Sequence, residues 1–99
     1  MIYLKFHEII QEDLKKIVLA AADESLIGKT IKDRNIEINV SEKFYKGKKV
    51  SEKELLDCLE SCNSANLIGN ETINVLLKHK IVKEEDLLRI NGVPHIILC

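Results

Sequence analysis

The sequence predicts an α+β fold, a two-layer sandwich in which two helices cover one face of a mostly antiparallel sheet. Three observations indicate it: alternating apolar residues at the start of the chain, two amphipathic segments in the second half, and an Asn-Gly pair near the end. One sheet packed against two helices would bury all of these apolar faces together. The length of 99 residues is typical of one domain, so we expect a single α+β domain over residues 1–99.

The first half of the chain is predicted to consist mainly of strands. Residues 2–8, IYLKFHE, alternate between apolar and polar side chains, as in a strand with one buried face. Residues 17–22, IVLAAA, form the continuous apolar run of a strand inside a sheet, and a hairpin joins the two. Residues 36–40 alternate again and predict a third strand, and residues 44–50 predict a reversal through Gly47.

Two helices are predicted in the second half. Ser51 and Glu54 have the spacing of a capping box, so the first helix begins at Ser51. Residues 63–69, NSANLIG, interrupt the helical pattern. Asn70 can cap a second amphipathic helix that ends near residues 79–80.

A hairpin closes the chain at Asn91 and Gly92, because a two-residue Asn-Gly turn favours the positive φ values of a type I′ turn. Its register places Leu88 opposite His95. Alternation then puts His95 on one face with four aliphatic residues: Leu88, Ile90, Val93 and Ile97. We interpret His95 as a partly buried histidine with a hydrogen-bond partner; the alternative is a binding or proton-transfer role.

Composition narrows the class of protein. Apolar residues make up 45% of the chain and charged residues 31%, as in a globular protein. With two Tyr, two Phe and no Trp, the chain lacks the aromatic residues of a platform that stacks single-stranded bases. We see no secretory signal and no membrane span, so we expect a cytoplasmic protein without membrane contact whose three cysteines are reduced.

Charge is unevenly distributed along the chain. The net charge is −1, but residues 29–53 contain eight basic residues against four acidic ones, a local charge of +4. The flanking segments are acidic, with −2 over residues 1–28 and −3 over residues 54–99. A basic middle segment can attract an anionic partner even when the whole protein is near neutral.

The most basic stretch is FYKGKK, residues 44–49, which we place at a hairpin tip. Its lysines, Lys46, Lys48 and Lys49, are candidates for contact with a nucleic-acid backbone. The alternative is an ordinary solvated loop, since no arginine is present for bidentate phosphate contacts.

Known catalytic and metal-binding patterns fit poorly. Residues 28–30, GKT, resemble the end of a phosphate-binding loop, but that motif needs a glycine where this chain has Asp23. The carboxylates of residues 84–86 are interpreted as a solvated charge run, and no catalytic triad can be argued from spacing.

The three cysteines give only a weak indication of metal binding. Cys58 and Cys62 are four residues apart and could join His95 or Cys99 around zinc, but they fall on the apolar face of the predicted helix, where thiols act as small hydrophobes. We therefore predict neither a metal site nor a cofactor.

Several stretches together resemble an archaeal family known as domain of unknown function 424. They are MIYLKFHE, AADESLIGKT, VSEKFYKG, ANLIGNETI and LLRINGVPHIILC, in this order, and the similarity covers nearly the whole chain. GVPH and ANLIG are the most specific. The resemblance implies an archaeal cytosolic protein with a small two-layer α/β fold and no established activity.

The family's characteristic residues fall on Asp23, Gly28, Lys29, Asn66, Gly69, Arg89, Gly92, Pro94 and His95. The glycines and the proline have backbone explanations, which leaves a candidate ligand site of Asp23, Lys29, Asn66, Arg89 and His95. The cysteines lie outside this pattern, and Asn91-Gly92 stands where relatives often have two glycines, which permit the same turn.

Two hypotheses of function follow, with a lesser third. The first is a non-catalytic binding module, with RNA, the ribosome or another protein as partner, based on the +4 segment. The second is a small-molecule-binding protein or enzyme built from the five candidate residues, provided that the fold gathers them in one pocket. The third is a protein interaction through an exposed sheet edge.

Overall fold

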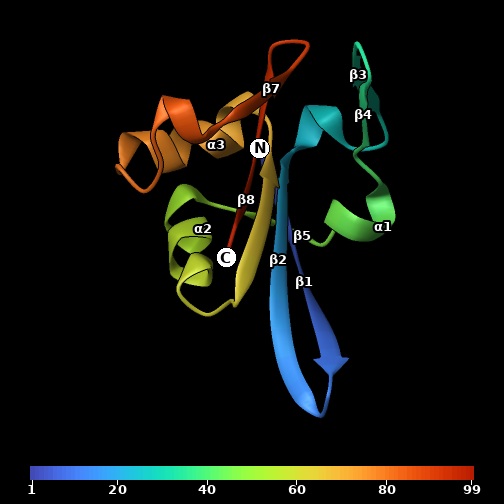
Figure 1. Ribbon diagram of the computed structural model, residues 1–99. Coiled ribbons are helices and arrows are strands. Elements are labelled where there is room, and N and C mark those ends of the chain that lie inside the picture. Colours follow the sequence, from blue (N-terminus) through green and yellow to red (C-terminus); the bar gives the residue numbers. More distant parts are fainter.

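The computed structural model describes residues 1–99, and its main element is a six-stranded sheet (Figure 1). The strands are β1 (Ile2–Gln11), β2 (Leu14–Asp23), β5 (Lys48–Val50), β6 (Ser64–Ile68), β7 (Leu88–Ile90) and β8 (Val93–Leu98), in the spatial order β5-β1-β2-β6-β8-β7. Neighbouring strands are antiparallel except β2 and β6, which run parallel. The α+β class is therefore confirmed, with a mixed sheet.

The sheet carries different elements on its two sides (Figure 1). The helices α2 (Glu52–Leu59) and α3 (Asn70–Lys78) lie on one side, as predicted. On the other side lie a one-turn helix, α1 (Glu42–Tyr45), and a separate hairpin of β3 (Thr30–Asp33) and β4 (Ile36–Asn39). The predicted pair of helices on one face is therefore present, but the prediction did not include the elements on the opposite face.

Two groups of buried residues hold these elements on the sheet. The larger lies under α2 and α3, where Leu55 and Ile73 of the helices pack with Leu19 and Leu67 of the sheet. The smaller lies under α1 and the β3–β4 hairpin and consists of Ala20, Ala22, Val40, Tyr45 and Ile68. Burial of each large aliphatic side chain contributes about 1.5–3 kcal/mol before the loss of chain entropy is subtracted.

The predicted β1–β2 hairpin forms, and its strands are longer than the sequence indicated. The lower part of this hairpin has no neighbouring strand, because β5 pairs only with Ile2–Leu4 and β6 pairs with β2 only from Val18 onward. It projects from the molecule as an arm (Figure 1). Ile10 and Leu14 are exposed at its end.

The middle of the chain departs from the predictions in its pairing and in one segment. The strand predicted at residues 36–40 forms as β4, but it pairs with β3 alone in the separate hairpin and not with the main sheet. Residues 44–50 were expected to be a simple reversal. They contain instead the end of α1 and the short edge strand β5, and Gly47 is required there because an added Cβ would lie 2.2 Å from the carbonyl oxygen of Leu4.

The second half matches the predictions except in one segment and one cap. The capping box of Ser51 and Glu54 is formed, and α2 begins after Ser51 as expected. Residues 63–69, which the sequence predicts to be an interruption between helices, contain β6, which lies in the interior of the sheet between β2 and β8.

Asp23, at the end of β2, caps α3, whereas Asn70 does not. The two carboxylate oxygens of Asp23 accept hydrogen bonds from the backbone amides of Glu71 (3.0 Å) and Thr72 (2.7 Å), and one of them also accepts from the Thr72 hydroxyl (2.7 Å). A side chain from elsewhere in the fold thus satisfies amides that the first helical turn leaves unpaired. Gly69 makes room for it, because an added Cβ would lie 2.3 Å from the Asp23 carboxyl carbon.

None of the helices has the length and apolar character needed to cross a membrane.

Candidate functional site

Three polar side chains meet on the sheet face that carries α1. Asn66 of β6 accepts two hydrogen bonds at its amide oxygen, one from the Tyr45 hydroxyl (2.8 Å) and one from Nε2 of His95 (2.8 Å). Alternation along β6 and β8 points Asn66 and His95 away from α2 and α3, and α1 brings Tyr45 over them. The three side chains form the Tyr45–Asn66–His95 network.

Burial fixes the protonation states in this network. His95 is only 8% exposed, and desolvation lowers its pKa below the ordinary value of 6.5. Because an amide oxygen can only accept, Nε2 of the neutral imidazole carries the proton. Burial also raises the pKa of Tyr45 to about 12, so its hydroxyl stays protonated. Both groups act as neutral donors at neutral pH. His95 is thus buried with a hydrogen-bond partner, which agrees with the interpretation from the hairpin register.

A second histidine lies against the other side of α1. His7 of β1 stacks on the Phe44 ring, with 4.7 Å between ring centroids, and its Nε2 donates to the Phe44 carbonyl oxygen at 2.8 Å. Phe44 in turn meets Tyr45 edge to face. The α1 turn therefore ties β1 to β6 and β8 through aromatic and polar contacts.

The five residues of the predicted ligand site do not gather in one place. Asn66 and His95 are in contact through the network. Asp23 is buried at the start of α3, and Arg89 is exposed on β7, where it forms a 2.7 Å ion pair with Glu84. Lys29 is exposed in the loop before β3. A single pocket lined by all five residues is therefore not formed.

The predicted basic loop is exposed, but its tyrosine is not. Lys46 and Lys48 are exposed and form no ion pair, whereas Lys49 pairs with Glu24 at 3.0 Å. The Nζ atoms of Lys46 and Lys49 lie 6.0 Å and 5.8 Å from the centroid of the Tyr3 ring. Tyr45, which the sequence places at an exposed hairpin tip, is a core residue instead.

Sequence reasoning missed the role of Tyr45, although a signal for it existed. Ser41 lies three residues before Phe44, and its hydroxyl accepts the Phe44 amide at 3.1 Å as the N-cap of α1. That spacing predicts one helical turn, which would turn Tyr45 inward.

The cysteines are separate free thiols. Cys58 and Cys62 are half-buried, and Cys62 donates to the Leu59 carbonyl oxygen at 3.3 Å. Burial raises the pKa of the Cys62 thiol, which favours its protonated form over the thiolate that metals bind. No group of three or more potential metal ligands is found.

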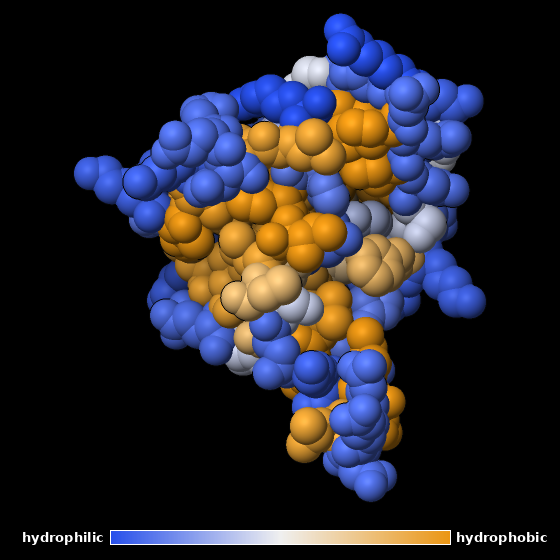
Figure 2. Space-filling view, viewed as in Figure 1, coloured by the Kyte–Doolittle hydropathy of each residue, from blue (hydrophilic) through white to orange (hydrophobic).

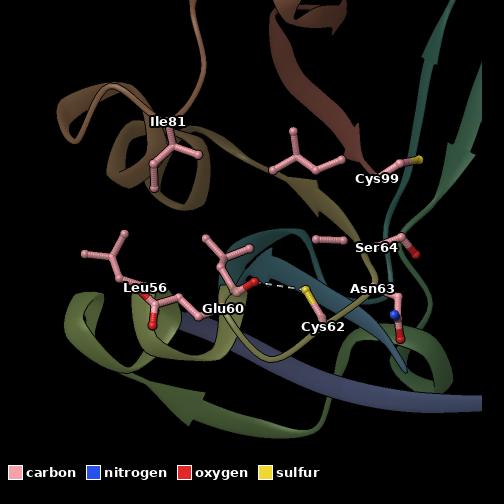
Figure 3. A pocket seen from close by; sticks show the side chains of 10 residues that line it. Leu56, Glu60, Cys62, Asn63, Ser64, Ile81 and Cys99 are labelled. Atoms are coloured by element: carbon pink, nitrogen blue, oxygen red, sulfur yellow. Dashed lines mark hydrogen bonds between the residues drawn. The ribbon is translucent and has the colours of Figure 1, made fainter. Parts of the chain in front are cut away.

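An apolar groove of about 430 Å³ lies at the end of β8 (Figure 3). Leu56 of α2 and Ile81, which follows α3, stand on opposite walls of this groove, and Leu98 and Cys99 form part of its lining. A smaller hollow of about 260 Å³ lies beside β8 at the start of β7, and its lining includes His95, Leu88 and Ile97.

Stability is expected to fall as the pH drops below about 6.5, because the folded protein resists protonation of His95. Above that pH the imidazole is neutral in both states. Below it the unfolded chain binds the proton more readily, so the free energy of unfolding falls by up to about 1.4 kcal/mol per pH unit until the folded-state pKa is passed. Denaturant titrations between about pH 7 and about pH 5 measure this slope.

The substitution His95→Gln should flatten the slope in this window, because it removes the buried group whose pKa is lowered. An equal slope in wild type and His95→Gln would contradict the assignment.

Comparisons with known proteins agree with the architecture. The model of a family described as "Protein of unknown function (DUF424)" matches residues 10–99. A solved structure, described as the crystal structure of an uncharacterized conserved protein from Methanopyrus kandleri, is similar with a TM-score of 0.78 and 24% sequence identity, over 98% of this chain and 89% of that chain. At this identity the likeness shows a shared fold. A search of curated proteins found no match.

Proposed function

The chain belongs to the family of proteins of unknown function DUF424, and for this member we propose a non-catalytic role as a cytoplasmic module that binds RNA, such as the RNA of the translation machinery. The observation that carries the proposal is the exposure of unpaired lysines at the β5 edge of the sheet.

The fold keeps the basic segment together in space. Residues 29–53 form β3, β4, α1, β5 and the start of α2, and the first three of these lie on the side of the sheet opposite α2 and α3 (Figure 1). The segment therefore presents its +4 charge on a limited part of the surface. The compensating negative charge lies in the flanking segments, −2 over residues 1–28 and −3 over residues 54–99.

Lysines stand on both sides of the edge strand. Lys48 pairs with Leu4 and shares its face, whereas Lys49 pairs with Tyr3 and shares the opposite face. Lys46 lies beside Lys49 over the Tyr3 ring. A phosphate backbone passing along this edge could contact Lys46 and Lys48 together, and Lys49 would add less because Glu24 already neutralises it.

The small number of exposed aromatic rings favours duplex RNA over single strands. Tyr45 is buried and Phe44 is partly covered by His7, which leaves few rings on which bases could stack. Recognition through phosphates and shape, as in double-stranded RNA binding, needs no such platform.

Changing Lys46 and Lys48 to Ala together is expected to weaken RNA binding. We would measure the anisotropy of a labelled RNA duplex of about 20 base pairs. With the wild type, the logarithm of the affinity should fall steeply between about 50 and about 200 mM salt. In Lys46→Ala/Lys48→Ala, the slope of that plot should become less steep by roughly 1 to 2. Each phosphate contact releases about one counterion on binding, and the variant makes fewer such contacts.

The matched control is Lys80→Ala/Lys83→Ala, which removes the same charge from two exposed lysines that also lack ion pairs and belong to the acidic part of the chain. Lysines on an edge strand can also act only to prevent aggregation. In that case Lys46→Ala/Lys48→Ala would aggregate more readily, and RNA affinity would be equal in all three proteins, which would refute the proposal.

A further inference from the structure

The outer edge of β8 is only half covered. Its neighbour β7 begins at Leu88, which lies opposite His95, whereas β8 continues to Leu98. Beyond His95, the outer side of β8 therefore faces no strand. The inner side remains paired with β6 as far as Leu98.

The uncovered backbone groups belong to Ile97. In a hairpin with a two-residue turn, Ile90 and Val93 form a hydrogen-bonded pair, so every second residue of β8 directs its amide and carbonyl toward β7. The carbonyl oxygen of Pro94 accepts the Gly69 amide on the β6 side, which agrees with this alternation. Ile97 thus points both its N–H and its C=O outward, past the end of β7.

This edge is bordered by apolar surface. Ile97 is 59% exposed, and Leu88 and Ile81 are each 46% exposed. The groove of about 430 Å³ and the hollow of about 260 Å³ both border the last residues of β8. In the space-filling view, hydrophobic residues occupy the region where Figure 1 places β8, between the α2–α3 side and the β3–β4 side (Figure 2). Monomeric proteins rarely leave an apolar patch and an open strand edge together.

We propose that this edge pairs antiparallel with the same edge of a second copy of the chain, about a two-fold axis that passes midway between the two Ile97 residues. With the axis perpendicular to the sheet, opposed residues must lie on the same face in each copy. A register centred on Ile97 meets this condition. Ile97 lies opposite Ile97 of the second copy, and Ile96 lies opposite Leu98 of the second copy.

The edge complements itself in hydrogen bonding and in side chains. The central pair is of the hydrogen-bonded kind, so each Ile97 amide donates to the carbonyl of the other Ile97. Ile96, Ile97 and Leu98 would meet only aliphatic partners, and the apolar grooves beside Leu98 in the two copies would face each other across the axis. A two-fold symmetric interface uses the same surface patch on both copies, so that patch must be complementary to itself.

The other strand edges fit a second copy less well. The β5 edge carries Lys48 and Lys49, and like charges would oppose each other in a symmetric pair. The β1–β2 arm has exposed aliphatic residues, but a symmetric β1 pairing that places Phe6 opposite Ile10 also places Glu8 opposite Glu8 of the second copy.

Sedimentation of the full-length chain tests the proposal, from about 1 to about 100 μM, since a specific interface of ordinary size gives dissociation constants in or below that range. We expect the wild type to be a dimer at the upper end. Ile97→Lys should sediment as a monomer, because it places two charges opposite each other in the apolar seam. Ile10→Lys makes the same change at a residue that is 76% exposed on the arm and should remain a dimer.

Oxidative cross-linking tests the register without a disruptive charge. In a chain with Cys58, Cys62 and Cys99 changed to Ser, Ile97→Cys should form a disulfide-linked dimer in high yield, because directly opposed hydrogen-bonded residues have Cα atoms about 5.5 Å apart, within disulfide range. Ile10→Cys in the same background should not.

A wild type that stays monomeric at every concentration would overturn the proposal and leave the edge to a different partner. A dimer that survives Ile97→Lys or dissociates with Ile10→Lys would overturn it too. The apolar seam contains no ion pair, so dimerisation should change little with salt, unlike the RNA binding proposed above. The two proposals can therefore fail independently.

Discussion

Asp23→Ala is expected to lower the free energy of unfolding by about 2–4 kcal/mol, a large part of the stability of a domain of this size. The carboxylate accepts two backbone amides of α3 and the Thr72 hydroxyl, and Thr72 is fully buried. After the substitution water cannot replace these acceptors at Thr72. The loss therefore includes both a helix cap and unpaired buried donors.

Denaturant unfolding monitored by circular dichroism measures this loss. Asp57→Ala removes an exposed carboxylate from α2 and should change stability by no more than about 0.5 kcal/mol. Asp23→Asn retains one acceptor oxygen, so its loss should lie between those of Asp57→Ala and Asp23→Ala.

A double-mutant cycle with Gly69→Ala tests the geometry. Gly69 has φ +115°, and its added Cβ would lie 2.4 Å from an Asp23 carboxylate oxygen. Alone, Gly69→Ala should be strongly destabilising through both the strained φ and the clash. In the Asp23→Ala background only the strain remains, so we expect a coupling of roughly 1–2 kcal/mol. Additive losses would show that the side chains do not meet as described.

The contact between Asp23 and α3 also illustrates what the sequence could not reveal. Capping signals are local, and Asn70 stands where a cap would be sought. The true acceptor lies 49 residues away from Thr72, and only the parallel pairing of β2 with β6 brings it to the helix. The resemblance placed Asp23 and Gly69 among the characteristic residues, and their contact gives a structural reason for both.

Local signals with strict geometry were read correctly. The Asn91-Gly92 turn adopts positive φ at both residues and sets the predicted pairing of Leu88 with His95. The capping box at Ser51 is equally local. In both cases neighbouring residues determine the structure, so tertiary packing has little opportunity to override it.

The strand β6 was missed because its sequence lacks the signals of an isolated strand. SANLI contains only two large aliphatic residues and no β-branched residue before its last position. Its stability comes from pairing on both sides with β2 and β8 and from burial of Leu67 and Ile68, none of which is visible along the chain. Once β6 is placed, Asn66 necessarily faces the same side as His95.

Asn66→Ala is expected to destabilise the fold by about 2–4 kcal/mol, because it removes the one acceptor shared by the Tyr45 hydroxyl and His95 Nε2. Tyr45 is 3% exposed and His95 8%, so neither donor can readily bond water instead. Asn74→Ala, at an exposed position of α3, is the matched control and should change stability by less than about 0.5 kcal/mol.

The same reasoning predicts a partial rescue. Tyr45→Phe removes one of the donors, so adding it to Asn66→Ala should cost less than it costs in the wild type, or even restore stability, since deleting both partners of a buried hydrogen bond is milder than deleting one. Denaturant unfolding of the four proteins measures the coupling. If Tyr45→Phe were equally destabilising in both backgrounds, the hydroxyl would have its main partner elsewhere, and the network would not be what holds α1 against the sheet.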